Sequence, residues 1–204
     1  FKAVKALKED YRIDKGVQIS LKKNIPIGAG LGGGSSNAAT VLLGLSKMWN
    51  LNISHQEMLK RGKNLGADVP FFINGENASV SGIGDRLKYK DSEKNKYVLL
   101  CPNINISTKE MFQYYENNFY TLKNTEKLNQ NSFLTSVLSR YSEINSFYKK
   151  NIISFNILLT GTGSTLFIPY KNSNDLDKIM QIIPINWRFF LTEAIQYSPL
   201  RGMK

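Results

Sequence analysis

The sequence predicts an α+β fold built as two domains, and three observations lead to this prediction. A glycine-rich stretch is followed directly by a long helical pattern of small and apolar residues. Helices that open with capping boxes then alternate with short strand-like runs. The polar stretch at 91–95 separates the two parts, so we expect one domain over residues 1–93 and a second over 94–204.

The elements of the first domain follow from apolar periodicity and from capping residues. Ser54-His-Gln-Glu57 is a capping box, and Gly66 occupies the position that ends the helix it opens. Small and apolar side chains recur on one face of the helix after the glycines, which is typical of a buried face. The expected elements are, in chain order, a helix over 1–10, a strand over 17–21, helices over 35–49 and 56–65, and strands over 78–81 and 86–89.

The second domain is predicted on the same grounds. A second capping box, Ser107-Thr-Lys-Glu110, opens its first helix. The stretch 117–131 is polar and rich in asparagine, so we expect a surface excursion there. The other expected elements are strands over 98–101, 157–159, 165–169 and 188–191, and helices over 133–138, 144–149 and 176–183.

Net charge and its distribution limit the classes of partner. The chain carries 27 Lys and Arg against 16 Asp and Glu, a formal charge of +11. The lysines are scattered, and no stripe interleaves them with aromatic residues as nucleic-acid-binding surfaces usually do. We therefore expect no nucleic-acid partner. A basic surface equally attracts a polyanionic small molecule.

Apolar, cysteine and histidine content limit the compartment and the chemistry. No apolar run is long enough to span a membrane, so we expect a cytoplasmic protein with no membrane partner. The one cysteine, Cys101, excludes an internal disulfide, fits a reducing compartment and is expected to be buried in a strand. The one histidine, His55, excludes metal sites built from clustered histidines and disfavours Ser-His catalysis.

The most informative stretch runs from Pro26 to Ala39. It holds five glycines among positions 28–34 and continues as Ser-Ser-Asn-Ala-Ala. Glycine permits a positive φ and close approach of the backbone to a ligand, so several N–H groups can converge on one point. The helix expected from Ser35 adds its own N-terminal N–H groups and dipole. This combination is an anion site, and a nucleotide phosphate is the anion we expect.

Three phosphate-binding motifs compete for this loop, with a flexible glycine linker as the structural alternative. A Walker A loop is excluded because Gly34 is followed by serines and not by lysine. The residues from Gly28 to Gly33 match the dinucleotide pattern, but a second helix follows where the dinucleotide fold needs a strand. The third motif, Pro-x-x-x-Gly-Leu-Gly-Ser-Ser-x-Ala-Ala, is the ATP loop of the GHMP small-molecule kinases, which the segment from Pro26 closely resembles.

Two further motifs contain residues suited to catalysis or substrate binding. Gly66-Ala-Asp68-Val-Pro places an aspartate between a helix end and a Val-Pro pair that favours extended backbone. Its carboxylate either projects from the turn or stabilises the turn as an Asx cap. Leu159-Thr-Gly-Thr-Gly163 is a second glycine-rich turn with hydroxyl groups, and its structural alternative is an ordinary hairpin connection.

These three motifs and the terminal Ser198-Pro-Leu-Arg201 together resemble the 4-diphosphocytidyl-2-C-methyl-D-erythritol kinases, a family of GHMP kinases. The resemblance extends in order over essentially the whole chain. It implies a GHMP kinase two-domain fold, with a partial ribosomal-protein-S5-like N-terminal domain and a ferredoxin-like C-terminal domain. It also implies a bacterial, ATP- and Mg²⁺-dependent kinase, a monomer or homodimer, that phosphorylates the 2-hydroxyl of a cytidine diphosphate substrate in the non-mevalonate isoprenoid pathway.

The resemblance also implies roles for single residues. Asp68 corresponds to the catalytic aspartate that contacts the substrate and takes the proton from its attacking hydroxyl. Thr108 and Phe112 fall at the cytidine end of the substrate, where Phe112 either stacks on the base or packs in the core. The residues implied to close over the transferring phosphate are Thr160, Gly161, Thr162 and Gly163. The residues implied to bind ATP are Lys23, Pro26, Gly28, Gly30, Leu31, Gly32, Gly33, Gly34, Ser35, Ser36 and Asn37, with a hydroxyl of Ser35 or Ser36 as the candidate contact to Mg²⁺.

The start of the chain departs from the family pattern. It begins at Phe1 inside an amphipathic helical pattern and without an initiator Met, so we expect a fragment. The family carries a lysine that partners the catalytic aspartate, together with aromatic and histidine substrate contacts, upstream of anything present here. We therefore expect this chain alone to bind ATP weakly and to catalyse little.

Three other functions stay open at this point. Another GHMP kinase, with a homoserine- or mevalonate-type substrate, would keep the ATP loop and Asp68 and lose the cytidine contacts. A non-catalytic member that binds nucleotide fits the incomplete start. A nucleic-acid-binding protein with a similar first-domain fold predicts an affinity that falls steeply with salt, and no ATP site.

Overall fold

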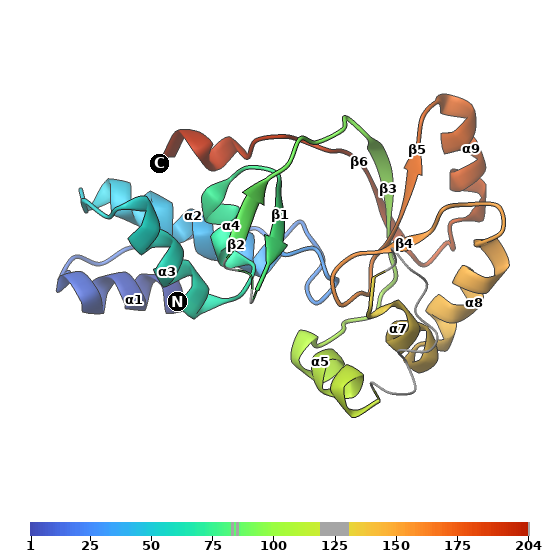
Figure 1. Cartoon of the computed structure of the whole chain (residues 1–204), viewed down its shortest axis with the longest axis horizontal. Coiled ribbons are helices and arrows are strands. Elements are labelled where there is room, and N and C mark those ends of the chain that lie inside the picture. Colours follow the sequence, from blue (N-terminus) through green and yellow to red (C-terminus); the bar gives the residue numbers. More distant parts are fainter. Residues whose placement is uncertain (83, 85, 119–130, 204) are drawn as a thin grey trace. The chain divides into compact units, whose positions relative to one another are not determined.

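The computed structural model describes residues 1–82, 84, 86–118 and 131–203, and the chain forms two compact units (Figure 1). Unit 1 consists of Phe1–Asn24, Gly32–Glu93 and Ile195–Lys204, and unit 2 of Ile25–Leu31 and Lys94–Ala194. Two segments are exchanged relative to the expected domain ranges of 1–93 and 94–204. The first half of the glycine loop belongs to unit 2, and the last residues of the chain belong to unit 1.

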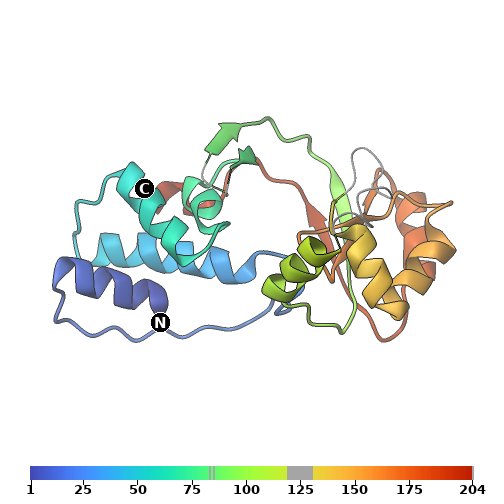
Figure 2. The same ribbon diagram turned by 60° about the horizontal axis from the view of Figure 1, so that its bottom comes forward.

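Unit 1 is mainly helical, and its core lies between its helices. The helices are α1 (Lys2–Tyr11), α2 (Gly33–Met48), α3 (His55–Leu65) and α4 (Val69–Asn74). α1 lies alongside α2 (Figure 2), and α4 contacts both α2 and α3. The apolar faces that meet there form one buried cluster: Ala3, Leu7, Ala39, Leu42, Leu43, Leu45, Met58, Val69 and Ile73.

The helix starts of unit 1 agree with the sequence prediction at one place and correct it at two. Ser54 Oγ accepts a hydrogen bond from Glu57 N at 3.2 Å, which confirms the capping box. α2 begins at Gly33 rather than near Ser35, because its N-cap, Gly32, has a left-handed φ of 65°. The Val69-Pro70 pair opens α4 instead of being extended, because proline is tolerated in the first helical turn, where its missing N–H has no intrahelical acceptor.

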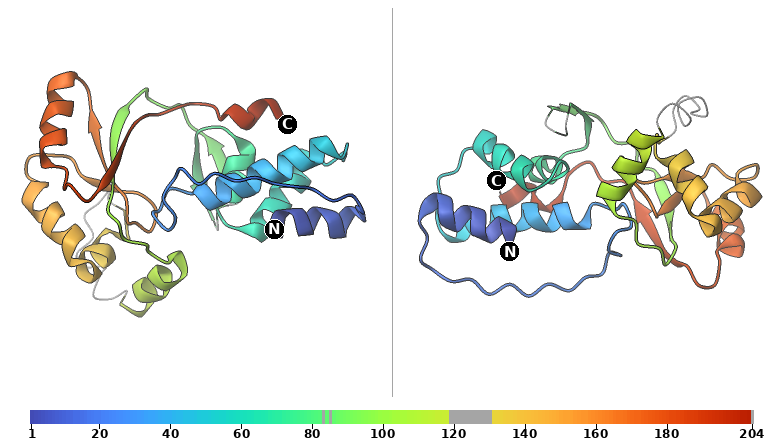
Figure 3. Two further views of the ribbon diagram at one scale, coloured as in Figure 1. Left: turned by 180° about the vertical axis from the view of Figure 1, so that it is seen from behind. Right: turned by 90° about the horizontal axis from the view of Figure 1, so that it is seen from below.

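The strand expected over 17–21 is not formed. Residues 12–24 leave α1 as an extended segment that, in the right-hand view of Figure 3, runs past the helices of unit 1. Val17, Ile19 and Leu21 alternate with polar residues as a strand would, and Ile19 and Leu21 are about half exposed. In the described part of the chain no strand pairs with this segment, and alternation without a hydrogen-bonded neighbour does not make a sheet.

Unit 1 is completed by a hairpin and by the end of the described chain. β1 (Ala78–Ser81) and β2 (Arg86–Tyr89) pair antiparallel with the bounds expected from the sequence. Asn77 N then donates to Gln196 O at 2.9 Å, and Ser198 N donates to Gly75 O at 2.9 Å. The short helix η1 (Pro199–Met203) contacts α2 and α4 and is seen beside α2 in the left-hand view of Figure 3.

Unit 2 is a four-stranded antiparallel sheet in the order β4-β5-β3-β6, with helices packed on one face. The strands are β3 (Lys96–Cys101), β4 (Leu158–Leu159), β5 (Leu166–Tyr170) and β6 (Arg188–Glu193). The helices are α5 (Thr108–Asn117), α7 (Leu134–Arg140), α8 (Ser142–Asn151) and α9 (Ser173–Ile182), and Figure 1 shows α8 and α9 on the same side of the sheet. Val98 and Leu100 of β3 are fully buried in the core with Ile144 of α8 and Ile179 of α9.

The elements predicted for unit 2 are confirmed with small shifts at their ends. Glu110 N donates to Ser107 Oγ at 3.3 Å, so the second capping box is formed. Cys101 ends β3 and is buried; burial raises the pKa of its thiol, partly offset by a hydrogen bond from Thr165 Oγ1 at 3.4 Å. The predicted excursion over 117–131 lies mostly outside the described residues. The mixture of helices and antiparallel strands confirms the α+β class.

Candidate functional site

The glycine loop has a regular backbone conformation. Gly28, Gly30 and Gly32 have positive φ values of 64°, 72° and 65°, so every second residue is left-handed. Such alternation turns successive N–H groups toward one side of the chain and forms a concavity suited to an anion. The loop is divided between the units after Leu31, and each half is held by its own unit.

The first half of the loop is fixed through its carbonyl groups. Gly28 O accepts from Ile106 N at 2.9 Å, and Ala29 O accepts from Thr165 N at 3.2 Å. Gly30 O accepts from the hydroxyl of Thr160. In a trans peptide the C=O and the following N–H point in opposite directions. Because unit 2 holds the carbonyls of residues 28–30, the N–H groups of residues 29–31 point away from the donors that hold those carbonyls.

Glycine is required in this half because backbone and side chains approach it closely. A Cβ on Gly30 would lie 2.4 Å from Thr160 O and 2.7 Å from Gly163 O. A Cβ on Gly28 would lie 1.5 Å from Asn105 Oδ1. The first half of the loop and the Thr160–Gly163 turn are therefore in direct backbone contact.

The Thr160–Gly163 turn is both a hairpin connection and a support for the loop. It joins β4 to β5, as its structural alternative predicted. Within it Gly163 N donates to Thr160 O at 2.9 Å, and Thr160 N donates to Thr165 O at 3.0 Å. Thr162 Oγ1 lies 3.2 Å from Thr108 Oγ1 at the start of α5. The structure thus brings together the first half of the loop, the second glycine turn and Thr108, all within unit 2.

Phe112 lies on the exposed side of α5 and not in the core. Its side chain is 48% exposed, whereas its neighbour Met111 is fully buried. The Phe112 ring meets the ring of Phe133 edge to face, with centroids 4.8 Å apart. The core interpretation of Phe112 is therefore wrong, and an aromatic surface is available on the helix that begins at Thr108.

The second half of the loop forms the start of α2 in unit 1. The first helical hydrogen bond runs from Ser36 N to Gly32 O at 2.9 Å, so the N–H groups before Ser36 have no intrahelical acceptor. No side chain of the described residues caps this end, and the first turn of α2 contains no acidic residue. Among the described residues, no hydrogen bond of the Ser35 or Ser36 hydroxyl is found. These donors and the helix dipole suit an anion.

Asp68 lies in unit 1 at the start of α4. It occupies the N-cap position, but its side chain accepts no capping hydrogen bond and is exposed, so the Asx-cap interpretation is wrong. The segment that carries it packs against the start of α2. A Cβ on Gly66 would lie 3.8 Å from Ser35 Oγ, and a Cβ on Gly32 would lie 2.9 Å from the ring of Phe72. The aspartate is therefore held close in the fold to the second half of the loop.

Four of the residues predicted to bind ATP take no part in these contacts. Lys23 is exposed in the extended segment, and within the described residues no hydrogen bond or ion pair involves it. Pro26 and Leu31 in the loop and Asn37 in α2 are partly buried, and their predicted roles stay predictions.

The sequence reasoning missed two asparagines. Asn105 packs against Gly28, and Asn131 donates to two carbonyls of the second glycine turn. A signal existed for Asn131, because asparagine two residues before a helical pattern can accept a hydrogen bond from the backbone N–H two positions on, as it does here from Phe133 N.

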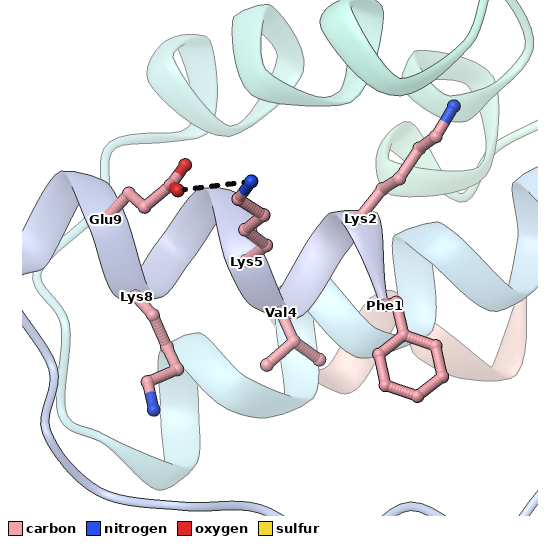
Figure 4. A pocket seen from close by; sticks show the side chains of 6 residues that line it. All are labelled: Phe1, Lys2, Val4, Lys5, Lys8 and Glu9. Carbon is pink, nitrogen blue, oxygen red and sulfur yellow. Dashed lines mark ion pairs between the residues drawn. The ribbon is translucent and has the colours of Figure 1, made fainter.

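Three further observations concern the described residues. Among the described residues, no group of three or more His, Cys, Asp or Glu side chains is placed to hold a metal ion. Also within those residues, none of the helices has the length and apolar character needed to cross a membrane. A shallow pocket on α1, lined by Phe1, Lys2, Val4, Lys5, Lys8 and Glu9, contains none of the predicted site residues, and Lys5 pairs with Glu9 there at 3.6 Å (Figure 4).

Comparison with known sequences gives consistent matches. Residues 1–76 match the family model of the GHMP kinases N terminal domain. A 4-diphosphocytidyl-2-C-methyl-D-erythritol kinase of Pasteurella multocida is 34% identical over an alignment of 212 residues with its gaps, and this alignment covers 100% of this chain and 70% of the relative. A protein of the same name from Buchnera aphidicola is 38% identical over 197 residues, covering 91% of this chain and 66% of the relative.

Comparison with solved structures agrees with the sequence matches. A crystal structure of 4-(cytidine 5'-diphospho)-2C-methyl-D-erythritol kinase aligns with a TM-score of 0.74 and 26% identity, over 94% of this chain and 76% of that one. A homoserine kinase from Cytophaga hutchinsonii aligns with a TM-score of 0.67 and 14% identity, over 96% and 75% of the two chains. At that identity the second likeness shows the fold alone. The kinase fold expected from the sequence is thereby confirmed.

Proposed function

The chain belongs to the 4-diphosphocytidyl-2-C-methyl-D-erythritol kinase family of GHMP kinases, and on that premise we propose that it transfers the γ-phosphoryl group of ATP to the 2-hydroxyl of 4-diphosphocytidyl-2-C-methyl-D-erythritol. Membership in a kinase family implies ATP as the co-substrate. The observation that carries the proposal is the glycine loop, whose carbonyls are held by the protein while its N–H groups are left for an anion. The same premise extends to a cytoplasmic location, to a small molecule rather than a nucleic acid as partner, and to a monomer or homodimer.

Phosphoryl transfer depends on positioning and charge neutralisation more than on covalent chemistry. We assign the N–H groups of the loop and of the first turn of α2 to the phosphates of ATP. The Thr160–Gly163 turn is assigned to the transferring phosphate. Fixed backbone dipoles suit this task, because they are in place before charge develops in the transition state.

Asp68 is the proposed general base. Its carboxylate is exposed and makes no capping hydrogen bond, so it is available to accept the proton of the attacking hydroxyl. Its segment packs at Gly66 against Ser35, so it is held by the helix whose first turn is assigned to the phosphates.

The hydroxyls of Ser35 and Ser36 fit a role in binding the Mg²⁺ that accompanies ATP. Magnesium prefers oxygen ligands, and these two side chains offer oxygens at the start of α2 that are not used in hydrogen bonds within the described chain. When bound, Mg²⁺ neutralises charge on the phosphates. The same hydroxyls also suit a direct hydrogen bond to phosphate.

Thr108 and Phe112 are the proposed contacts to the cytidine end of the substrate. Thr108 Oγ1 is 3.2 Å from Thr162 Oγ1, which links the start of α5 to the turn assigned to the transferring phosphate. The Phe112 ring is half exposed and can stack on a base. A homoserine- or mevalonate-type substrate has no base, so Phe112→Ala separates the alternatives. It should weaken binding of the cytidine substrate by about tenfold or more, since stacking on an aromatic ring contributes about 1–3 kcal/mol per base.

The decisive experiment measures ADP release from Mg-ATP by the natural protein that contains this chain, with and without the cytidine substrate. Asp68→Asn should lower substrate-dependent ADP release by about 10²- to 10⁴-fold, as expected for loss of a general base. Its affinity for ADP should stay close to that of the parent protein. Asp177→Asn removes another exposed carboxylate, on α9, and serves as the matched control, with unchanged turnover.

Two results would contradict the proposal. Asp68→Asn with the turnover of the parent protein would exclude Asp68 as the base. ADP release that depends on homoserine or mevalonate, and not on the cytidine substrate, would move the assignment to another GHMP kinase.

A further inference from the structure

Asn131, which lies outside the predicted site, holds the turn that supports the glycine loop. Its Nδ2 donates to Gly161 O at 2.7 Å and to Leu159 O at 3.2 Å. Its Oδ1 accepts from Phe133 N at 2.9 Å, and its backbone carbonyl accepts from Leu134 N at 2.9 Å. One side chain therefore connects the start of α7 to the Thr160–Gly163 turn, and both lie in unit 2.

The orientation of the Asn131 amide follows from its partners. The oxygen faces a backbone N–H, which can only donate, and the nitrogen faces two carbonyls, which can only accept. The flipped amide would place its oxygen against both carbonyls and its NH₂ against the N–H, so it would lose all three hydrogen bonds. The side chain thus has one satisfied orientation, and it is a donor toward the turn.

These hydrogen bonds fix two peptide planes of the turn. Because C=O and N–H are antiparallel in a trans peptide, holding Leu159 O toward Asn131 directs Thr160 N–H the other way, where it donates to Thr165 O at 3.0 Å. Holding Gly161 O toward Asn131 likewise directs Thr162 N–H away from Asn131. No hydrogen bond of that N–H is found among the described residues, so it is a free donor.

The Thr160–Gly163 turn also determines where the first half of the loop lies. Thr160 donates its hydroxyl to Gly30 O, and a Cβ on Gly161 would lie only 3.1 Å from that same oxygen. A rotation of the peptide planes at Thr160 or Gly161 would therefore move Gly30 or break its hydrogen bond. The connection runs from Asn131 through the turn to the loop by direct contacts at each step.

We infer that Asn131 is a positioning residue for phosphate binding. By donating to Leu159 O and Gly161 O, it keeps Thr162 N–H free for an anionic oxygen and keeps the first half of the loop in place. It acts through the turn and not by contact with the ligand. The inference rests on the proposed function in one respect, which is that the anion belongs to ATP or to the phosphoryl group it transfers.

The test replaces Asn131 with aspartate in the natural protein. Asn131→Asp keeps the shape of the side chain and the Oδ1 acceptor for Phe133 N, but it removes both donors and places a carboxylate oxygen against two carbonyls. Asn118→Asp is the matched control, because Asn118 is also half-buried in unit 2 and its Nδ2 donates to one backbone carbonyl, Tyr114 O, at 2.8 Å. Asn131→Ala, which introduces no charge, provides a second variant if the aspartate protein does not fold.

Two quantities are measured. Hydrogen exchange of backbone amides should accelerate about tenfold or more in peptides covering 158–165 and 25–31, with α8 (Ser142–Asn151) unchanged as the internal reference. The affinity for a non-hydrolysable Mg-ATP analogue, which keeps the γ-phosphate assigned to this turn, should fall by about tenfold, the change expected when hydrogen bonds that hold a binding turn are lost. Asn118→Asp should change neither the exchange of those two peptides nor the affinity.

Each result separates this inference from the proposed function. Unchanged exchange at 158–165 in both Asn131 variants overturns the inference. It is also overturned if exchange in α8 accelerates as much as exchange at 158–165, because that would show general destabilisation. Accelerated exchange with the affinity of the parent protein overturns the link to phosphate binding. If the parent protein binds no nucleotide, the proposed function fails, and the exchange data alone decide whether Asn131 fixes the turn.

Discussion

The two halves of the glycine loop look alike in sequence and are held in different ways. In the first half, Ile25–Leu31, glycines are surrounded by protein, and a Cβ on Gly30 would overlap the backbone of the second turn. In the second half, a Cβ on Gly34 would meet nothing within 4 Å. The fold therefore requires glycine in the first half and also at Gly32, whose Cβ would lie 2.9 Å from the Phe72 ring, whereas Gly34 has room that the fold does not use. We propose that Gly34 is glycine because a ligand approaches it.

This difference separates stability from binding along a single motif. Substitutions in the first half should unfold or distort unit 2, whereas a substitution at Gly34 should leave the fold intact and affect the ligand. Three substitutions test this difference.

Gly30→Ala should destabilise the protein most. The left-handed φ of 72° costs an alanine about 1–2 kcal/mol, and the overlap with Thr160 O and Gly163 O adds a cost of similar size. The free energy of unfolding should therefore fall by about 3 kcal/mol, measured by denaturant titration. An unfolding midpoint equal to that of the parent protein would show that the fold does not require glycine at position 30.

Thr160→Val should have an intermediate effect. The substitution keeps the shape of the side chain and removes the hydroxyl that donates to Gly30 O, so the free energy of unfolding should fall by about 1 kcal/mol. Thr192→Val is the control. The Thr192 hydroxyl of β6 donates to Tyr97 O of β3 at 3.4 Å, and neither residue contacts the loop through a hydrogen bond among the described residues. Mg-ADP affinity should fall for Thr160→Val and stay constant for Thr192→Val. If the two variants bind Mg-ADP with equal affinity, the hydrogen bond from Thr160 to Gly30 O does not contribute to nucleotide binding.

Gly34→Ala should have the smallest effect on stability and the opposite sign. Alanine favours a helix over glycine by about 0.5–1 kcal/mol, and Gly34 and Gly44 both lie in α2 with open space at the Cβ position. Both Gly34→Ala and Gly44→Ala should therefore raise the thermal unfolding midpoint by a few degrees. Gly34→Ala alone should weaken Mg-ADP binding, because only Gly34 lies in the turn assigned to phosphate. Equal affinities in the two variants would show that the second half does not approach the nucleotide.

Local features of the fold were predictable from the sequence, because their causes are local. The capping boxes at Ser54 and Ser107 join residues three positions apart, and both hydrogen bonds are formed. The strands β1 and β2 were also predicted with their observed bounds. The interpretation of Val69-Pro70 as extended was wrong, because the first turn of a helix tolerates proline and the preference for extended backbone there is weak.

Features that depend on distant residues were not predictable. Val17, Ile19 and Leu21 alternate as a strand would, yet pairing depends on a neighbouring strand that no local pattern supplies. The glycines of the candidate site were identified as a motif, but their individual reasons were not. Gly30 contacts Thr160, which follows it by 130 residues, and Asn131 supports the loop only through that turn. Such three-dimensional contacts decide at which positions the fold itself requires glycine.

The interleaving of the two units has a consequence for biosynthesis. Residues 25–31 leave the ribosome long before Thr160 and Thr165, the partners that hold them, so the first half of the loop stays without its support until most of unit 2 has been translated. Unit 1 begins the chain, but it receives its contacts with Gln196 and Ser198 only after unit 2 is complete. The nascent chain therefore cannot finish its first unit and then its second in order. Both reach their final structure at the same late stage of translation, after a long interval in which each lacks a segment.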